Sequence, residues 1–573
     1  MNMLRITLAQ LNFTIGDLSG NLAMMTSAAR EAAADGAALV AFPELALTGY
    51  PPGDLLTEAD FLARVEAALA DLLEASRATP DLYWAFGVPL ARTGPGKALE
   101  NGILVVADGA VVLRYAKQLL PTYNVFDERR YFEPGPEAAP VLTLRTATAK
   151  DIRIGFLICE DAWNDAGGDY PVNPFTRMRE AAPDLVVILN ASPSDIGKRG
   201  QRHALLTAAS RRHELPMLYV NQVGGHDQLV FDGASFAVTP RAGVVFEAAR
   251  FSEAVVTLAF ADGAFFDADG RALADVPAAG LSAMDFYHRQ IVLGLADYAR
   301  RCGFTRAVVG ASGGIDSALT LALAAEALGQ ENVAAVTLPS RFSSAGSVED
   351  SVALCANLGV RLFTHPIRDL VAAYEQGFAD AFGLPLRGLA LENLQARARG
   401  AVLMEYSNHF GALLLTTGNK SEISVGYCTL YGDTNGGLGL IGDLYKTEVF
   451  ALSRHINAVA GRDIIPAAIL EKPPSAELAP NQKDTDSLPP YPTLDAILKM
   501  LIEGERLSAE EREQVRADYA RLAANAEGAA LIARVRRMIW KNEYKRRQAP
   551  PILRLRPLAF GSGRQMPIAA KYE

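Results

Sequence analysis

Short apolar runs rich in β-branched residues alternate with alanine-rich stretches along most of the chain, and this pattern is the strongest constraint on the fold. Such runs are typical of buried strands, and the alanine-rich stretches between them are typical of helices. The alternation therefore predicts α/β domains. It stops once, in the Gly-, Asp- and Ala-rich segment 260–280, which we interpret as a linker. We expect a first domain over residues 1–262, a linker over 263–281 and a second domain over 282–573.

The individual elements follow from the same runs. The strands predicted in the first domain are Leu4–Ala9, Ala38–Phe42, Gly102–Val106, Ile152–Ile158, Leu185–Leu189 and Met217–Val220. Helices are predicted there over Leu22–Ala34 and Glu58–Arg77. The strands predicted in the second domain are Ala307–Gly310, Val333–Leu338, Arg361–Thr364 and Ala412–Thr416. The segment Lys472–Pro490 contains five prolines and is predicted to be a long loop acting as a lid, and the basic stretch Leu531–Arg547 is predicted to be a helix.

Composition limits the classes of function. The 573 residues carry 55 Lys and Arg against 65 Asp and Glu, which gives a formal net charge of −10. An acidic chain is a poor general binder of polyanions, so we expect no nucleic-acid partner. Neither an apolar run of about 18 residues nor a signal-peptide pattern occurs, so we expect no membrane span and a cytoplasmic location. The four cysteines lie far apart without CxxC pairs, which favours reduced thiols over disulfides or a structural zinc site.

Three reactive side chains come at or just after predicted strands in the first domain. Glu44 follows the run ALVAFP, Lys117 follows VVLRYA and Cys159 follows IRIGFLI. A cysteine attacks as the thiolate, and a nearby ammonium lowers the pKa of a thiol. A carboxylate takes the thiol proton and returns it to a leaving amine, while an ammonium stabilises the tetrahedral oxyanion. Together, these side chains predict hydrolysis of a carboxamide.

The local sequences around the three residues strengthen this prediction. The segments FPELALTGY, KQLLPTY and CEDAW resemble the three catalytic blocks of the nitrilase superfamily, and the resemblance extends over most of residues 1–260. It implies an αββα sandwich in which Glu44 is the general base and acid, Lys117 stabilises the oxyanion and Cys159 is the nucleophile.

A further resemblance narrows the substrate of the first domain. The segment YNVFDE, residues 123–128, looks like the glutamine-binding part of glutamine-hydrolysing members of the superfamily. It implies that Tyr123 contacts glutamine and that Glu128 orients the lysine or the substrate. In the segment NASPSDIGK, it assigns glutamine contacts to Ser192 and Lys198. Because glutamine presents both an ammonium and a carboxylate, we expect a polar mouth to the pocket.

A glycine-rich turn follows the first predicted strand of the second domain. The sequence GASGGIDS, residues 310–317, leads into an Ala- and Leu-rich helix. Successive glycines let the backbone approach a ligand closely, and amide N–H groups at a helix N-terminus bind an anion. The turn does not match the P-loop pattern GxxxxGK[ST], so the usual P-loop interpretation fails. It resembles the SGGxDS loop of ATP pyrophosphatases, which cleave ATP to AMP and pyrophosphate.

Five further blocks resemble the synthetase domain of the glutamine-dependent NAD(+) synthetase family. They are, in order, ENLQARAR (392–399), TTGNKSE (416–422), GYCTLYGD (426–433), KPPSAEL (472–478) and EYKRRQ (543–548). The resemblance implies a doubly wound parallel sheet of the adenine nucleotide alpha hydrolase type. It also implies the reaction of deamido-NAD(+), ATP, L-glutamine and water to NAD(+), AMP, diphosphate and L-glutamate, through an adenylate intermediate.

The same resemblance assigns roles to single residues of the second domain. The residues implied to bind ATP are Gly310, Ala311, Ser312, Gly313, Gly314, Ile315, Asp316, Ser317, Thr417, Lys446 and Ser475. Those implied to contact deamido-NAD(+) are Asn393, Lys420, Glu422, Asp433 and Lys545. Asp316 and Glu422 are implied to hold Mg²⁺, which suits a hard cation that prefers carboxylate oxygens. The fusion of the two activities leads us to expect a homo-oligomer and a protected passage for ammonia from Cys159 to the adenylate site.

Three other functions compete with this interpretation. One is a different glutamine amidotransferase of the same ATP pyrophosphatase type, acting on another carboxylate. A second is an amidase whose second domain only senses a nucleotide, which cleavage of ATP to AMP would exclude. The third is a non-catalytic interaction protein, in which the reactive residues would have no reason to be intact.

Overall fold

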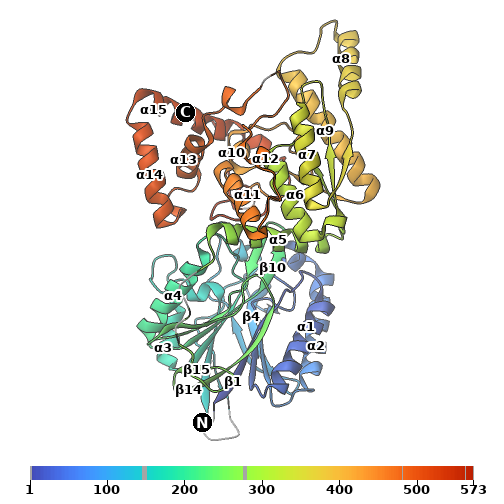
Figure 1. The fold of residues 1–573 in the computed structure, drawn as a ribbon. Helices are drawn as coiled ribbons and strands as arrows, with labels where there is room; N and C mark the ends of the chain where they lie inside the picture. The colour runs from blue at the N-terminus through green and yellow to red at the C-terminus, as the bar shows by residue number, and fades with distance from the viewer. Residues whose placement is uncertain are drawn as a thin grey trace. The chain divides into compact units, whose positions relative to one another are not determined.

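The structure is a computed structural model that describes residues 3–571 apart from 145–150, 275, 277–279, 481 and 562. The chain divides into two units, the first made of residues 1–224 and 230–280 and the second of residues 225–229 and 281–573 (Figure 1). Part of the expected linker therefore falls outside the described residues. No described helix is long and apolar enough to cross a membrane.

The first unit is built on two large β-sheets. The strands of the seven-stranded sheet are, in spatial order, β15 (Ala264–Phe266), β14 (Ala254–Ala261), β1 (Leu4–Gln10), β2 (Leu39–Ala41), β3 (Tyr83–Ala91), β4 (Leu99–Ala107) and β5 (Ala110–Ala116). Those of the six-stranded sheet are β13 (Gly243–Glu247), β12 (Phe236–Thr239), β9 (Met217–Asn221), β8 (Leu185–Asn190), β7 (Ile152–Ile158) and β6 (Val141–Leu144). A separate pair is formed by β10 (Val223–His226) and β11 (Leu229–Asp232).

Alternating side chains make these sheets the inner layers of a sandwich. In β7, Ile154, Phe156 and Ile158 lie in the core between the sheets, whereas Leu157 packs on the opposite face. The helices that cover the outer faces are α1 (Leu18–Ala34) and α2 (Ala59–Ser76) on the seven-stranded sheet, and α3 (Pro174–Ala181) and α4 (Lys198–His213) on the six-stranded sheet (Figure 1). The expected αββα sandwich is confirmed.

The second unit is built on a five-stranded parallel sheet. Its spatial order is β18 (Arg361–Thr364), β17 (Val333–Thr337), β16 (Ala307–Gly310), β19 (Leu413–Thr416) and β20 (Leu438–Gly439). The chain runs outward in one direction from β16 to β18 and then returns to β19 on the other side of β16, which is the doubly wound order that was expected. The loops after the neighbouring strands β16 and β19 therefore meet at the carboxyl edge of the sheet, where such folds bind ligands.

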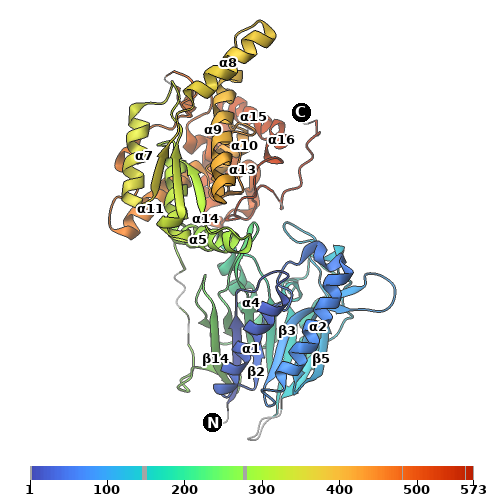
Figure 2. The same cartoon turned by 90° about the vertical axis from the view of Figure 1, so that its right-hand side faces the viewer.

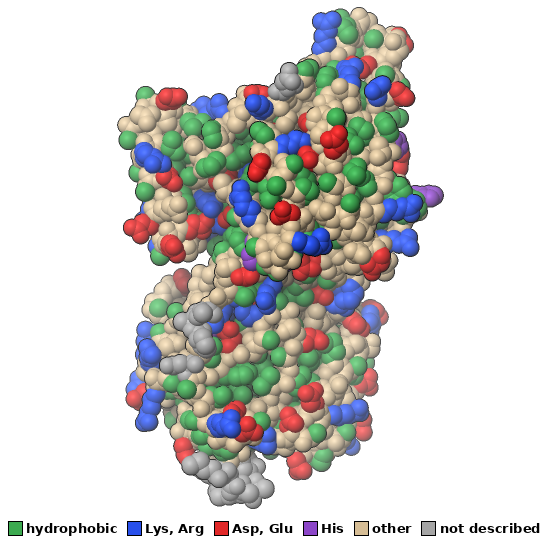
Figure 3. All heavy atoms as spheres, in the orientation of Figure 1, with side chains coloured by type: hydrophobic (Ala, Val, Ile, Leu, Met, Phe, Trp, Pro, Cys, Tyr) green, Lys and Arg blue, Asp and Glu red, His purple; other side chains and the backbone are tan. Residues whose placement is uncertain are grey.

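Helices cover both faces of this sheet, with α7 and α9 on opposite sides (Figure 2). The helices of this unit are α5 (Ala283–Arg301), α6 (Ile315–Leu328), α7 (Ala345–Leu358), α8 (Arg368–Phe382), α9 (Leu389–Phe410), α10 (Lys420–Val425), α11 (Lys446–Ala460), α12 (Ala467–Glu471), α13 (Tyr491–Ile502), α14 (Ala509–Ala523), α15 (Ala526–Lys541) and α16 (Glu543–Arg546). A separate apolar cluster includes Leu494 and Ile497 of α13, Val535 of α15 and Val425 of α10, and it anchors the C-terminal helices. On the face drawn in Figure 3, basic and acidic side chains are interspersed.

Two predicted elements differ from the structure. The predicted linker begins with a strand, because β15 pairs with β14 and its Phe265 is buried in the first core. The predicted helix over 531–547 is interrupted at Asn542, which separates α15 from α16. The Asn542 amide donates to the carbonyl of Val425 at 2.7 Å, so a tertiary contact ends the helix there.

Candidate active sites

Glu44 and Lys117 meet in the interior of the first unit. Lys117 directly follows β5, Glu44 comes shortly after β2, and neither side chain has exposed surface. Lys117 Nζ lies 2.7 Å from Glu44 Oε1 and contacts both carboxylate oxygens of Glu128, at 2.8 and 2.9 Å. Burial by itself lowers the pKa of Lys117, but the Glu128 and Glu44 carboxylates outweigh burial and raise this pKa well above its usual value. The lysine is therefore held as an ammonium.

The Glu44 carboxylate is oriented by two further donors. Its Oε1 accepts a hydrogen bond from Asn101 Nδ2 at 2.7 Å, and its Oε2 accepts one from the backbone N–H of Ala191 at 3.1 Å. The loop that carries Glu44 crosses β3 at Gly87, where a Cβ atom would lie 2.0 Å from the Leu45 nitrogen. The Glu44 carboxylate, which is the implied general base, is thus fixed in position before any substrate binds, as efficient proton transfer requires.

Cys159 directly follows β7 and is buried, with its backbone in the left-handed region at φ +40°. Burial and the Glu44 carboxylate raise the pKa of the thiol, and the opposing effect of Lys117 is too small to reverse this. The lysine therefore does not produce the net lowering expected from the sequence. The cysteine rests as a thiol and needs a base when it attacks, which is the role implied for Glu44.

Glu128 completes the buried cluster around Lys117. Its Oε1 accepts from the Tyr50 hydroxyl at 3.0 Å, and its Oε2 lies 3.3 Å from Asn101 Nδ2. Burial and the neighbouring Glu44 raise the pKa of Glu128 to about 7, although Lys117 and Tyr50 oppose the shift. These contacts favour the option in which Glu128 orients the lysine.

Glu160, the residue after the nucleophile, gathers the hydroxyls of two tyrosines. Its carboxylate accepts from Tyr123 Oη at 3.0 and 3.2 Å and from Tyr170 Oη at 3.0 Å. Tyr123 is 49% exposed, so this group reaches the surface. Lys198 at the start of α4 lies with its Nζ 3.9 Å from the centre of the Trp163 ring and contributes to the electrostatic environment of Glu160. The structure thus brings Tyr123 and Lys198 close to a buried carboxylate that the sequence did not single out.

Ser192 lies in the turn after β8 and is almost fully buried. Its backbone N–H donates to Asn221 Oδ1 at 2.9 Å, and its hydroxyl oxygen accepts from Arg202 Nε at 3.1 Å. Burial raises the pKa of Tyr219, and a side-chain hydrogen bond with Ser192 opposes this rise.

The glycine-rich turn at residues 310–317, named the pyrophosphate loop after its expected role, joins β16 to α6 and requires glycine at Gly313. That residue has φ +74°, and a Cβ atom there would lie 2.3 Å from the carbonyl oxygen of Ser347. The hydroxyls of Ser312 and Ser317 lie 3.1 Å apart, and Ser312 Oγ accepts from the N–H of Gly314 at 3.2 Å. Gly310 ends β16, the residues Ala311, Ser312, Gly313 and Gly314 form the turn, and Ile315, Asp316 and Ser317 begin α6.

Lys446 lies between the two carboxylates that the resemblance assigns to Mg²⁺. Its Nζ contacts Asp316 Oδ2 at 2.5 Å and Glu422 Oε1 at 3.0 Å. Asn419, which caps α10, donates to Asp316 Oδ1 at 2.8 Å and so joins the loops after β16 and β19. Burial and the negative charges of Asp316 and Asp484 raise the pKa of Glu422 to about 7, despite the opposing charge of Lys446.

The residues present fit a divalent cation, although they do not form a cage for one. Among the described residues, no three His, Cys, Asp or Glu side chains are arranged to hold a metal ion. Two carboxylates are nevertheless the donor set that Mg²⁺ uses when phosphate oxygens and water complete its shell. Burial is the main cause of the raised pKa of Glu422, and the negative charges of Asp316 and Asp484, which a cation would offset, add to it.

The two other residues assigned to ATP lie in different settings. Thr417 follows β19 at the carboxyl edge of the sheet and is partly buried. Ser475 lies in the proline-rich segment and is exposed, and its hydroxyl donates to the carbonyl of Gln482 at 2.6 Å. That segment is tied to α7, because Glu477 accepts from the Ser347 hydroxyl at 2.7 Å. Through Ser347 the segment adjoins the pyrophosphate loop.

Three residues assigned to the dinucleotide surround the loop 426–433. Lys545 Nζ donates to the carbonyls of Gly426 and Cys428 at 2.8 and 2.7 Å. Thr429 donates through its hydroxyl to Asn393 Oδ1 at 2.8 Å and through its N–H to Asp433 Oδ1 at 2.5 Å. Burial raises the pKa of Asp433 to about 6, although two backbone N–H groups and Lys545 lower it. Asn393, Asp433 and Lys545 thus form one polar group.

Lys420 lies apart from these residues. Its side chain has no exposed surface, and its Nζ contacts Asp443 Oδ1 at 2.7 Å and Glu503 Oε1 at 2.9 Å. The same nitrogen donates to the carbonyl of Leu558 at 2.7 Å. Two ion pairs and a backbone carbonyl thus tie Lys420 into the second unit, and the dinucleotide contact implied for it stays a prediction.

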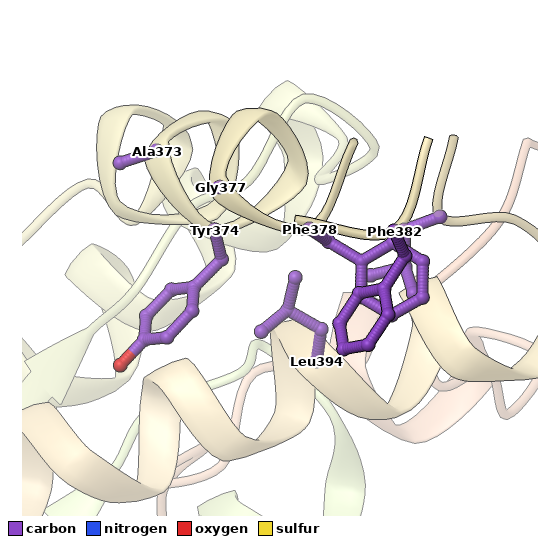
Figure 4. A pocket seen from close by; sticks show the side chains of 7 residues that line it. Ala373, Tyr374, Gly377, Phe378, Phe382 and Leu394 are labelled. Atoms are coloured by element: carbon purple, nitrogen blue, oxygen red, sulfur yellow. The ribbon is translucent and has the colours of Figure 1, made fainter. Parts of the chain in front are cut away.

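A cavity of about 480 Å³ lies between α8 and α9, and it shares no residue with the clusters above (Figure 4). Its walls are formed mainly by Tyr374, Phe378 and Phe382 of α8 and Leu394 of α9. Tyr374 is 63% exposed and Phe382 67% exposed, so the cavity is an open apolar depression. It contains no group suited to the predicted chemistry.

The two folds and their clusters define a bifunctional enzyme class, in which a carbon–nitrogen hydrolase is joined to a nucleotide-dependent synthetase. Residues 5–262 match the carbon-nitrogen hydrolase family, and residues 287–549 match the NAD synthase family. The glutamine-dependent NAD(+) synthetase of Synechocystis sp. is 42% identical over 100% of this chain and 99% of its own length. That of Rhodobacter capsulatus is 41% identical over 99% of this chain and 98% of its own. The chain belongs to the glutamine-dependent NAD(+) synthetase family.

Solved structures agree with this assignment. The glutamine-dependent NAD+ synthetase from Acinetobacter baumannii in complex with adenosine diphosphate is 35% identical, with a TM-score of 0.74 over 99% of this chain and 98% of that one. The enzyme from Cytophaga hutchinsonii is 22% identical with a TM-score of 0.80 over the same shares, which shows a common fold. The resemblance stated from the sequence is confirmed.

Several residues of these clusters were not found from the sequence. Asn101 lies with Glu100 at the start of β4, just before the apolar run Gly102–Val106 that was predicted as the strand, so no pattern in the sequence distinguished it. Tyr50 lies in the segment FPELALTGY that also contains Glu44, and Glu160 directly follows Cys159 in the segment CEDAW. This proximity in sequence was the available signal for both residues. Asp484 and Tyr491 gave no local signal, because the contacts of the Tyr491 hydroxyl with Asp484 at 2.7 Å and Glu422 at 3.2 Å are tertiary.

Proposed function

We propose that the protein makes NAD(+) and AMP from deamido-NAD(+) and ATP, with ammonia supplied by hydrolysis of L-glutamine. The observation that carries the proposal is the presence on one chain of a Glu44–Lys117–Cys159 cluster and a pyrophosphate loop flanked by Asp316 and Glu422. The relatives of about the same length carry the same activity in their names.

In the first unit, Glu44 accepts the thiol proton as Cys159 Sγ attacks the side-chain carbonyl carbon of glutamine. Lys117 stabilises the oxyanion, and Glu44 passes the proton to the departing ammonia. A water molecule, deprotonated by Glu44, then hydrolyses the thioester and releases glutamate. The burial of all three residues supports this sequence of steps, because charge interactions are strong where water is excluded.

Recognition of glutamine is assigned to the polar group beside Cys159. Glu160, with Tyr123 and Tyr170, has the negative charge and geometry to receive the α-ammonium. Lys198 supplies a positive charge for the α-carboxylate, and Ser192 supplies a hydroxyl. These contacts extend the sequence-based assignment of Tyr123, Ser192 and Lys198.

In the second unit, the nicotinate carboxylate attacks the α-phosphorus of ATP, pyrophosphate leaves, and ammonia then displaces AMP from the adenylate. The N–H groups of residues 310–317 and the Lys446 ammonium offset the charge on the phosphates. Asp316 and Glu422 would hold Mg²⁺, which supplies charge neutralisation at the phosphates. Thr417 and Ser475 are assigned to ATP, and Asn393, Asp433 and Lys545 to the dinucleotide, where a carboxylate and an ammonium suit its hydroxyl and phosphate groups.

We also propose a homo-oligomer that works in the cytoplasm. The exposed apolar side chains of α8 and of Leu384 and Leu389 support self-association, because such patches commonly mark interfaces. All four cysteines are unpaired, which supports a reducing compartment.

The proposal is tested by supplying deamido-NAD(+), ATP and Mg²⁺ with either glutamine or ammonium chloride. NAD(+) and AMP should form in equal amounts with both nitrogen donors, and glutamate should form only with glutamine. If AMP forms without NAD(+), the acceptor is another carboxylate.

A further inference from the structure

Arg202 of α4 is a charged side chain in the interior of the first unit, with 1% of its surface exposed. Three of its hydrogen bonds go to one short segment, and a fourth goes to Asp232. Its Nε donates to Ser192 Oγ at 3.1 Å, and its Nη2 donates to the carbonyls of Ser192 at 2.6 Å and Pro193 at 3.0 Å. Its Nη1 donates to Asp232 Oδ1 at 2.7 Å.

The segment 191–193 that Arg202 holds touches the reacting groups directly. The Ala191 N–H binds Glu44 Oε2 at 3.1 Å, and Ser192 is one of the side chains assigned to glutamine. Asn221 of β9 holds the same segment from the other side, since its Oδ1 accepts from the Ser192 N–H at 2.9 Å. A shift of the segment would therefore move a donor away from the base and a hydroxyl away from the substrate.

The charge of Arg202 is balanced by Asp232, which also accepts from Arg250 at 3.1 Å. A buried ion pair is a weak source of stability, because desolvation offsets the attraction between the charges. An arginine fork, however, fixes several acceptors in one plane, and a lysine ammonium cannot reproduce that geometry. The arrangement is therefore better explained by the placement of the segment than by the stability of the fold.

We propose that Arg202 is a positioning residue for glutamine hydrolysis, which holds the 191–193 segment so that Ala191 orients Glu44 and Ser192 faces the substrate. The inference rests on the glutaminase half of the proposed function. It assigns Arg202 a role in the rate of the reaction and in the binding of glutamine, without direct contact with the substrate.

The test compares Arg202→Lys with Arg250→Lys in the full-length chain. Both variants keep a positive charge beside Asp232, and Arg202 in addition donates to Ser192 and Pro193. Glutamate release is measured against glutamine concentration with saturating deamido-NAD(+), ATP and Mg²⁺. Ammonium-driven NAD(+) formation and the thermal unfolding of each variant are measured in parallel.

For Arg202→Lys we expect kcat/KM for glutamine to fall by about 30-fold, with a higher KM and a lower kcat. We expect Arg250→Lys to stay within about 3-fold of the wild type, and ammonium-driven synthesis to be unchanged in both. Equal losses in the two variants, or a wild-type kcat/KM in Arg202→Lys, would overturn the inference. If Arg202→Lys does not fold, Asn221→Ser tests the same segment from β9, and an unchanged kcat/KM there would overturn it. A wild type that releases no glutamate would instead refute the proposed function.

Discussion

At the scale of single residues, both sites place a buried lysine between two carboxylates. Lys117 lies between Glu44 and Glu128, and Lys446 lies between Asp316 and Glu422. In each site the pKa of one glutamate rises to about 7, because burial and the second carboxylate outweigh the lysine. In the first site the ammonium is itself the oxyanion stabiliser of the proposed mechanism. In the second site the Lys446 ammonium balances part of the negative charge of Asp316 and Glu422.

Asn101 gives a test of how strongly Glu44 must be oriented. Asn101→Ala removes the 2.7 Å hydrogen bond to Glu44 Oε1 and the 3.3 Å contact with Glu128 Oε2, and it leaves the side chains of Lys117 and Cys159 unchanged. A hydrogen bond to a charged group contributes about 1.5–3 kcal/mol, so kcat/KM for glutamine should fall by about 10- to 100-fold. Steady-state glutamate release measures the effect, and ammonium-driven NAD(+) formation by the same variant is the control. A loss of both activities would show that the substitution disturbs the whole chain.

Asp161 gives a test of the buried charge beside the nucleophile. Burial raises the pKa of Asp161 to about 6, although Tyr115 and backbone N–H groups lower it. The folded state therefore binds a proton that the unfolded state has lost between about pH 4 and pH 6, so this group makes stability fall as pH rises through that window. The loss is on the order of 3 kcal/mol for the shift from 3.8 to about 6.

Urea unfolding at pH 4.5, 5.5 and 7 measures this dependence in the wild type and in Asp161→Asn, with the fluorescence of the three tryptophans, Trp84 and Trp163 in the first unit and Trp540 in the second, as the signal. The free-energy difference between wild type and variant should shrink as pH rises. If the difference in unfolding free energy between wild type and Asp161→Asn stayed constant with pH, the raised pKa of Asp161 would be contradicted.

At the scale of elements, several apolar runs were predicted close to their observed bounds, whereas other strands, among them the long β3 and β14 and the short β10 and β15, were not predicted as strands. Ile152–Ile158 and Ala307–Gly310 are confirmed at both ends, because their apolar side chains are buried in the sheets. The strand β10 has the sequence VGGH and was missed, because neither its length nor its composition distinguishes it from a turn. The residues of β15 were predicted to belong to the linker, because only their pairing with β14 identifies them as a strand.

The candidate sites could be predicted only as far as the local blocks reached. Glu44, Lys117 and Cys159 were placed by strand ends and motifs, and the structure brings them together. The burial of Lys420 could not be foreseen, because its partners Asp443 and Glu503 are distant in sequence and give no periodic signal. The net rise in the pKa of Cys159 likewise depends on burial, which motifs do not report.

The pyrophosphate turn offers an element-scale test with a matched control. Gly313→Ala puts a Cβ atom 2.3 Å from the Ser347 carbonyl at a positive φ, so the turn and α7 must separate. Synthesis of NAD(+) from ammonium should fall by at least about 100-fold, because the N–H groups lose their alignment. Gly346→Ala in α7 meets no atom within 4 Å and should stay within about 2-fold of the wild type. Equal activity of the two variants would show that the turn tolerates a side chain.

At the scale of the whole molecule, the two chemistries are separable by mutation. Cys159→Ala should reduce glutamine-driven NAD(+) formation by at least about 10³-fold, because no other thiol lies beside Glu44 and Lys117 among the described residues. Ammonium-driven formation should be unchanged, because the residues assigned to ATP and the dinucleotide belong to the second unit. Cys355→Ala is the control for loss of a buried thiol. If Cys159→Ala kept its glutamine-driven activity, the nucleophile would be another residue.

The pairing of β1 with β14 sets the order in which the first domain is completed during synthesis. Leu4 lies opposite Phe260, and Gln10 opposite Ala254. The strand β1 is synthesised first, and β14 begins 244 residues after β1 ends, so one edge of β1 stays unpaired until β14 has been made. At about 5–20 residues per second, the delay is about 12 to 50 s. The sheet that contains β1 in the glutamine-hydrolysing unit therefore has an unpaired strand edge during most of its translation. A chaperone or a neighbouring nascent chain could bind this edge before β14 does.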